Sequence, residues 1–188
     1  HKAIRRQRQM CIRDRIYIKS DKEIELMRKP CEIVRDVLCL CEEKIRAGMT
    51  TKELDKIAYD YITSCGATPS FLGYGGFPAA TCISIDEQVV HGFPSDRIIE
   101  EDQIVSVDVG AFFNGFHGDA ARSLYVGHIS PEKKKLIDVT RECFFEGIKG
   151  ICIGSALGDI GAQVQEHAEK NGFSVVSCLL YTSPSPRD

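Results

Sequence analysis

The chain has 188 residues, 43% of them hydrophobic, so it can bury a substantial core as one domain or two small ones. Its net charge of −3 is uneven: residues 1–15 hold six Lys/Arg and one Asp, which leaves 18 basic and 26 acidic residues elsewhere. A body this acidic argues against nucleic-acid binding, no apolar run could span a membrane, and nine cysteines without a C-x-x-C pair indicate a reduced, cytoplasmic protein.

Both ends of the chain differ in composition from its body. Residues 1–15 show no helical or strand period, and the last residues are rich in serine and proline. We therefore predict that 1–15 and 178–188 are disordered or artefactual tails, and that 16–177 form the domain. An arm that contacts the ribosome or nucleic acid is the alternative interpretation of the basic first segment.

Two capping boxes predict two helices in the first half of the domain. Residues 20–23 (Ser-Asp-Lys-Glu) open a helix that ends near Gly48, with a new turn or a kink at Pro30. Residues 50–53 (Thr-Thr-Lys-Glu) open a second helix, which Gly66 ends. Their apolar positions recur at helical spacing, which predicts that both helices cover a core.

A glycine- and proline-rich loop over 66–78 leads into predicted strands near 80–85 and 88–91, followed by a long hairpin. Two further helices are predicted, one from Ser130-Pro131 to about residue 147 and one from Ser155 to just before Gly172. These helices weakly repeat the first pair at an offset of 103 residues. The predicted fold class is α/β (α+β), with a complete first half and a second half that stops where its strands should begin.

The hairpin carries two aspartates on one face. Asn114-Gly115 favours a type I′ turn, and a turn there sets Asp108 opposite Ala121 and Asp119 opposite Gly110. Because side chains alternate along strands, the two carboxylates become diagonal neighbours. On a mostly covered face they would repel each other unless a cation lay between them, and such oxygen ligands suit one divalent metal or a pair roughly 3.5–4 Å apart. The simpler alternative is that both aspartates face solvent on the open side of the sheet.

Two stretches together resemble type I methionine aminopeptidases. They read FLGYGGFPAATCISIDEQVVHGFP (71–94) and IVSVDVGAFFNGFHGDAARSLYVG (104–127), and the resemblance extends over about 16–177. It implies a pita-bread fold, two related α/β halves around a dinuclear metal centre. It also implies removal of the initiator methionine from nascent polypeptides by a metal-activated hydroxide.

The resemblance assigns ligands residue by residue. Asp108 would chelate one ion and Asp119 would bridge two divalent ions, which in the family are cobalt, manganese, iron or zinc. The remaining ligands of the family, one histidine and two glutamates, have no match in 127–188, and His128 and His167 lie in the wrong contexts. The chain as given is therefore expected to be an inactive fragment.

Further site residues follow from the same resemblance. His91, in the HGFP element, is expected to be catalytic and to contact the peptide, whereas a histidine at a strand end is by itself more often structural. Tyr74, Phe77 and Cys82 match positions that line the methionine pocket, where thioether–aromatic contacts suit the substrate. Phe71 is a weaker candidate, since an ordinary aromatic core explains it equally well.

The resemblance also carries departures and rivals. Asp86 replaces an asparagine in a turn that helps to bind a monovalent cation in relatives, and Ala120-Ala121 replace a hydroxyl residue. The implied partners are the N-terminal methionine of nascent peptides and the ribosome, with no membrane and a monomeric state. Xaa-Pro aminopeptidases or prolidases of the same fold, and a pita-bread binding protein without metals, are the alternatives.

Overall fold

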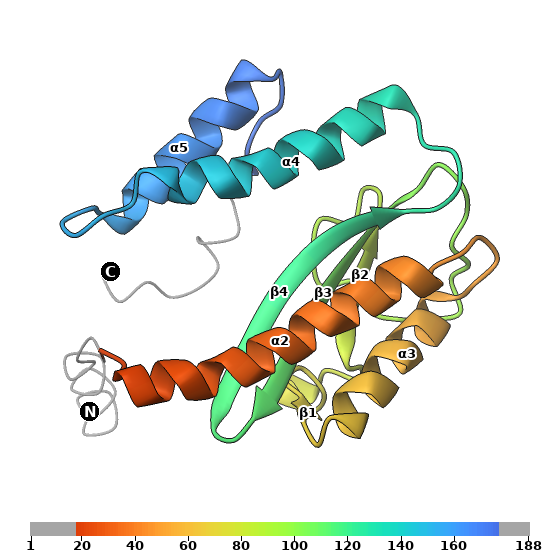
Figure 1. Cartoon of the computed structure of the whole chain (residues 1–188). Helices are drawn as coiled ribbons and strands as arrows, with labels where there is room; N and C mark the ends of the chain where they lie inside the picture. Colours follow the sequence, from red (N-terminus) through yellow and green to blue (C-terminus); the bar gives the residue numbers. More distant parts are fainter. Residues whose placement is uncertain (1–17, 177–188) are drawn as a thin grey trace, which may run out of the picture. The chain divides into compact units, whose positions relative to one another are not determined.

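The structure is a computed structural model that describes residues 18–176 (Figure 1). The predicted tails 1–15 and 178–188 lie outside the described residues. In chain order the elements are α2 (Asp21–Lys44), α3 (Thr51–Ser64), β1 (Thr68–Pro69), the 3-10 turn η1 (Tyr74–Gly76), β2 (Thr81–Ile85), β3 (Ile104–Phe113), β4 (Phe116–Tyr125), α4 (Pro131–Lys149) and α5 (Leu157–Lys170). The described chain divides into two compact units, 19–134 and 135–176.

The first unit is an antiparallel sheet with two helices on one face. β3 is its central strand: β1 and β2 pair with successive parts of one edge, and β4 pairs along the other. Val105, Val107 and Val109 of β3 are fully buried with the inner faces of α2 and α3. The alternate residues of β3, Asp108 among them, therefore lie on the opposite face of the sheet.

Both predicted capping boxes are confirmed. Ser20 caps α2 and Thr50 caps α3, each through reciprocal bonds with the glutamate three residues on. At Pro30, where a new turn or a kink is predicted, α2 continues as one helix and buries this residue, so no second helix starts there. A Cβ on Gly118 of β4 would lie 2.4 Å from the Pro30 carbonyl carbon, so the helix crosses the strand where the strand has no side chain.

The strand predicted at 88–91 is a loop. The chain turns at Asp86, where φ is +50°, and returns so that the Gly92 carbonyl accepts a hydrogen bond from Ile83 N at 2.9 Å. A Cβ on Gly92 would lie only 2.1 Å from the Ile83 carbonyl oxygen, so no side chain fits. The strand predicted from the periodicity of 88–91 is wrong because the contact of Gly92 with β2, and not pairing along 88–91, fixes the position of this segment.

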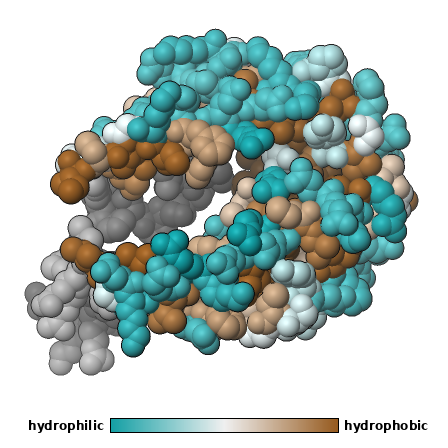
Figure 2. Space-filling view, viewed as in Figure 1, coloured by the Kyte–Doolittle hydropathy of each residue, from teal (hydrophilic) through white to brown (hydrophobic). Residues whose placement is uncertain are grey.

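The second unit packs α4 against α5 around a small core of Val139, Cys143 and Ala168. The second helix begins at Leu157 and not at Ser155, because the Asp159 carboxylate accepts from Ala156 N at 2.8 Å while Ser155 Oγ accepts from Cys152 N. Much apolar surface stays exposed here, visible as brown atoms on this unit in Figure 2. Phe144, Phe145, Ile148, Ile153 and Leu157 are among the exposed apolar residues of this unit.

Candidate functional site

The register of the hairpin is the one that the sequence predicts. Asn114 and Gly115 both have positive φ, and Asp108 pairs with Ala121 while Gly110 pairs with Asp119. The two carboxylates are therefore diagonal neighbours on the face away from the core. The expectation of a mostly covered face is wrong for Asp119, which is exposed, because α2 and α3 cover the other side of the sheet. Asp108 is half-buried.

The electrostatic environment penalises charge at both carboxylates. Burial raises the pKa of Asp108, the nearby Asp119 raises it further, and His91 opposes the shift. Although Asp119 is exposed as a residue, partial desolvation of its carboxyl group raises its pKa too, an effect that His117 opposes. The pair is thus harder to ionise than ordinary aspartates, and a bound cation would relieve that cost.

Cys82 closes one side of the acid pair. It is the cross-strand partner of Asp108 between β2 and β3, and its side chain is buried. Burial, with the charges of Asp108 and Asp119, raises the pKa of the thiol to about 11. The thiol therefore stays protonated near neutral pH and acts as a small apolar wall rather than a nucleophile.

Three phenylalanines form an edge-to-face cluster next to the acid pair. The Phe77 ring lies 6.4 Å from Phe71 and 5.1 Å from Phe93, centroid to centroid. Phe71 lies over Gly110, where an added Cβ would approach the ring to 2.8 Å. The sequence singled out Phe77 and, less strongly, Phe71, but missed Phe93. Its position two residues after His91 was the available signal.

His91 is close enough to Asp108 for its charge to lower the pKa of that carboxyl. It is exposed and has a positive φ of 57°. The following residue anchors it, since Gly92 N donates to the buried Ser84 Oγ at 3.0 Å. In contrast, the Tyr74 side chain is 83% exposed, so its place in the pocket stays a prediction.

The structure adds His117, which sequence reasoning did not select. It lies on the same face as Asp119, two residues before it on β4. Its Nδ1 is 2.8 Å from Ser70 Oγ, and its ring packs on Phe112 at a centroid distance of 4.7 Å. The alternation of strand residues was the signal that could have identified it.

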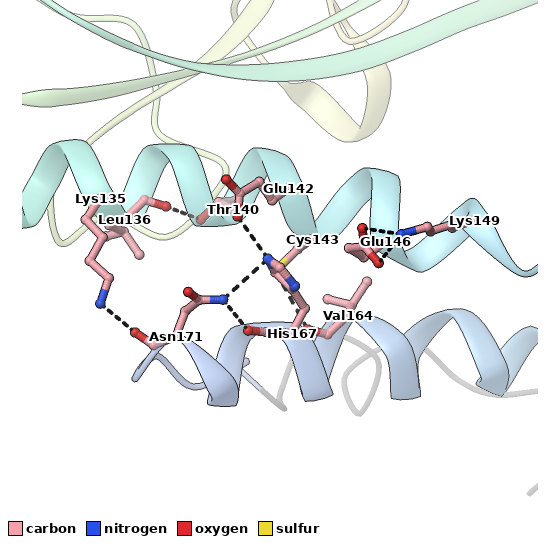
Figure 3. A network of polar contacts seen from close by, with 10 residues as sticks. All are labelled: Lys135, Leu136, Thr140, Glu142, Cys143, Glu146, Lys149, Val164, His167 and Asn171. Carbon is pink, nitrogen blue, oxygen red and sulfur yellow. Dashed lines mark hydrogen bonds and ion pairs between the residues drawn. The ribbon is translucent and has the colours of Figure 1, made fainter.

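The carboxylate pair suits part of a divalent metal site. Its donors are oxygens, its charges repel, and Ala121 leaves space beside Asp108. Within residues 18–176, no group of three or more His, Cys, Asp or Glu side chains could hold a metal. His167 is engaged elsewhere: its Nε2 lies 3.0 Å from Glu142 Oε2, in the α4–α5 network of Figure 3.

The Asp86 carboxylate lies in the turn where the resemblance implies a monovalent cation, and it already has polar partners. Asp86 Oδ1 accepts from Ile104 N at 3.0 Å and lies 3.2 Å from the Lys133 Nζ. A side-chain ammonium therefore already supplies positive charge to this turn.

Over the described part of the chain, no helix has the length and apolar character needed to cross a membrane.

Comparison with known proteins gives one consistent family. Residues 25–181 match the model of metallopeptidase family M24. A methionine aminopeptidase of Clostridium perfringens is 51% identical over 161 residues, which are 86% of this chain and 65% of that protein. The chain thus spans about 65% of the length of this relative.

Solved structures agree on the fold. A methionine aminopeptidase of Rickettsia prowazekii superposes with a TM-score of 0.84 at 36% identity, covering 86% of this chain and 65% of that one. An X-Pro aminopeptidase of Thermotoga maritima gives a TM-score of 0.70 at 23% identity and covers 89% of this chain and 45% of that one. The second likeness shows the fold alone.

Proposed function

Since this chain belongs to metallopeptidase family M24, we propose that it supplies part of the active site of an enzyme that removes the N-terminal methionine from new polypeptides. It has the mixed helix and sheet of the pita-bread methionine aminopeptidases. The observation that carries the proposal is the diagonal pair of Asp108 and Asp119, with Cys82 and His91 beside it. Two acids and a buried thiol share one face of the sheet, and His91 is close enough to affect the pKa of Asp108.

In this proposal the two aspartates hold divalent metal. The two carboxylates repel each other in the free protein, and the attraction of each to a bound cation would offset that repulsion. Bound divalent ions would supply the activation of water and the polarisation of the scissile carbonyl. Cobalt, manganese, iron and zinc all accept carboxylate ligands in proteins, so the chain leaves the metal open.

The apolar residues bind the substrate side chain. Phe77 and Cys82 provide an aromatic edge and a protonated thiol, which suit the polarisable thioether of methionine. Phe71 and Phe93 extend the same surface. This part of the site selects a flexible, sulfur-containing side chain by contact rather than by charge.

His91 acts on the peptide backbone. Its loop is fixed by the Gly92 contact with β2, while its ring lies near Asp108. A donor held beside the metal ligands can stabilise the developing oxyanion or protonate the leaving amine. We assign that catalytic role to His91.

The experiment uses a hybrid that joins residues 16–177 to the part of the Clostridium perfringens relative beyond the match. Release of methionine from a Met-Ala peptide should require added Mn²⁺ or Co²⁺ and should stop with EDTA. Asp108→Asn and Asp119→Asn should each abolish it, with Glu25→Gln on exposed α2 surface as the matched carboxylate control. Near-normal turnover in either aspartate variant at full metal occupancy would refute the ligand assignment.

The same assay on the 188-residue chain alone should show no release, because two carboxylates bind a catalytic metal pair weakly. A hybrid that binds Met-peptides without cleaving them would support the binding-protein alternative. Cleavage of Ala-Pro in preference to Met-Ala would support the Xaa-Pro alternative.

We further propose a cytoplasmic monomer that meets its substrates at the ribosome.

A further inference from the structure

One lysine gathers three oxygen atoms from two turns. Lys133 Nζ lies 3.2 Å from Asp86 Oδ1 and 3.7 Å from Asp102 Oδ2, and it donates to the Asp102 carbonyl oxygen. Asp86 and Asp102 both have left-handed φ angles, +50° and +57°, which few residues other than glycine adopt. Two carboxylates and a carbonyl around one point are ligands of the kind that alkali cations prefer.

The same oxygens are bound into the backbone of their surroundings. Asp86 exchanges two hydrogen bonds with Ile104, through Ile104 N to Oδ1 at 3.0 Å and Asp86 N to the Ile104 carbonyl at 2.9 Å. Asp102 Oδ1 accepts from Ser130 N at 2.7 Å, and Asp102 N donates to His128 O at 3.1 Å. The ammonium thus stands where the end of β2, the turn before β3 and the first turn of α4 come together.

We propose that the Lys133 ammonium is the resident cation of this site, so that no free monovalent ion binds at the Asp86 carboxylate. Lys133 is the third residue of α4, and its side chain is about one-third exposed. Ser130, just before this helix, donates its N–H to the carboxylate of Asp102, which is the second carboxylate beside the ammonium. A tethered cation loses side-chain freedom but no translational entropy, and it is present at any ionic composition.

The cation also fixes one end of the loop that carries His91. Asp86 begins this loop, and Gly92 ends it against β2. With both ends held, the segment 87–91 has little freedom to move the histidine away from Asp108. Lys133 is thus a positioning residue for His91, and this consequence, unlike the cation itself, bears on the proposed function.

The first test is thermal unfolding of the 188-residue chain. Lys133→Met removes the charge but keeps most of the apolar stem, and should lower Tm by roughly 3–8 °C, since two carboxylates lose their cation. Lys133→Arg should keep most of that Tm. The matched control is Lys56→Met, which breaks an exposed pair with Asp60 and should change Tm by less than about 2 °C. Equal effects at Lys133 and Lys56 would contradict the proposal.

The second test replaces the tethered cation with a free one. In Lys133→Ala, exchanging choline chloride for K⁺ or ethylammonium chloride at constant ionic strength should raise Tm saturably. The unaltered chain should show no such difference. A K⁺-specific rise in the unaltered chain would show that a free ion binds there, which overturns the proposal even if Lys133→Ala does not fold. A folded Lys133→Ala without rescue would reduce the site to an ordinary ion pair.

The positioning of His91 has its own readout, independent of activity. In aromatic ¹H–¹³C spectra, the His91 resonance, assigned with His91→Gln, should shift or broaden in Lys133→Met and return in Lys133→Arg. His167, bonded to Glu142 in the other unit, should not move. An unmoved His91 resonance would reject the positioning role while leaving the proposed function intact.

Discussion

At Asp108, burial and a neighbouring negative charge act in the same direction on one carboxyl group. Its folded pKa is raised, so the native state binds a proton more readily than the unfolded chain. Stability contributed in this way is present at low pH and falls as pH rises from the ordinary aspartate range through the raised value.

Asp108→Asn removes this fall. Without metal, the variant should be as stable as the unaltered chain near pH 4 and more stable at pH 8, by less than about 1 kcal/mol because solvent screens a half-buried group. Urea unfolding in EDTA at the two pH values measures the difference. A variant that is less stable at both pH values would show that hydrogen bonding, not repulsion, dominates at Asp108.

Substitution of His91 should have a different kinetic effect from substitution of the proposed metal ligands. In the active hybrid, His91→Ala should leave the metal content unchanged and lower kcat by roughly 10²–10⁴-fold, with a smaller effect on KM, because its contact strengthens in the transition state. Steady-state rates on one Met-peptide and metal analysis of the same sample decide this. Loss of metal would make His91 a ligand, and unchanged kcat would make it structural.

How well the sequence predicts a site residue depends on what places that residue. Asp108 and Asp119 follow from a two-residue turn and strand alternation, which are local and strict. Phe93 was missed because its loop is placed by the contact of Gly92 with Ile83, nine residues back in the chain. The Lys133 contact with Asp86 spans 47 residues and leaves no local pattern.

At the scale of elements, Asp55 joins α3 to the start of β2. Its Oδ1 accepts from Ala80 N at 3.1 Å, from Thr81 N at 2.8 Å and from Thr81 Oγ1 at 2.7 Å. Thr81 is fully buried and precedes Cys82, so this carboxylate sets where the wall of the proposed site begins.

Asp55→Ala should therefore destabilise the chain by about 2–3 kcal/mol, because buried donors lose their acceptor. Asp55→Asn retains an acceptor oxygen and should cost less. Burial raises the pKa of Asp55, so its charge lowers the free energy of unfolding increasingly as pH rises above the ordinary aspartate value. The stability cost of Asp55→Asn, relative to the unaltered chain, should therefore be smallest at high pH. Denaturant unfolding across pH 4–8 would show equal costs for both variants if the hydrogen bonds were unimportant.

The helices with paired caps were predictable to within a few residues, since Ser20 and Thr50 carry complete capping boxes. Pro30 does not end α2: its missing N–H costs one hydrogen bond, which burial against β4 offsets. The start of α5 was misplaced because Ser155 Oγ accepts from Cys152 N, before the helix, whereas the Asp159 carboxylate bonds Ala156 N and marks the first turn.

At the scale of the whole molecule, the two units differ in the size of their cores. Unit 19–134 buries one continuous cluster from the sheet and both helices, whereas 135–176 buries only a few side chains between α4 and α5. A small core gives low local stability. In native-state hydrogen exchange, α5 amides should exchange at least ~100-fold faster than those in the middle of α2. Equal protection would show that the chain unfolds as one cooperative unit.

The sequence predicts the division at this scale only in part. The repeat of helix pairs indicated two related halves, and the matched structures bear out the fold. Apolar periodicity shows which face of α4 is apolar, but it does not show what covers that face. In the described structure, Phe144 and Ile148 of α4 are exposed.

The type I′ turn at Asn114-Gly115 has a consequence for the order of folding. Hairpins with two-residue turns close in roughly 1–10 μs, well before distant contacts form. Asp108 and Asp119 are only eleven residues apart, whereas Gly118 meets Pro30 across 88 residues. We therefore expect the acid pair to assemble early, with α2 docking later. Gly115→Ala should mainly slow refolding and Gly118→Ala should mainly speed unfolding in stopped-flow experiments; the reverse pattern would mean that the helix docks first.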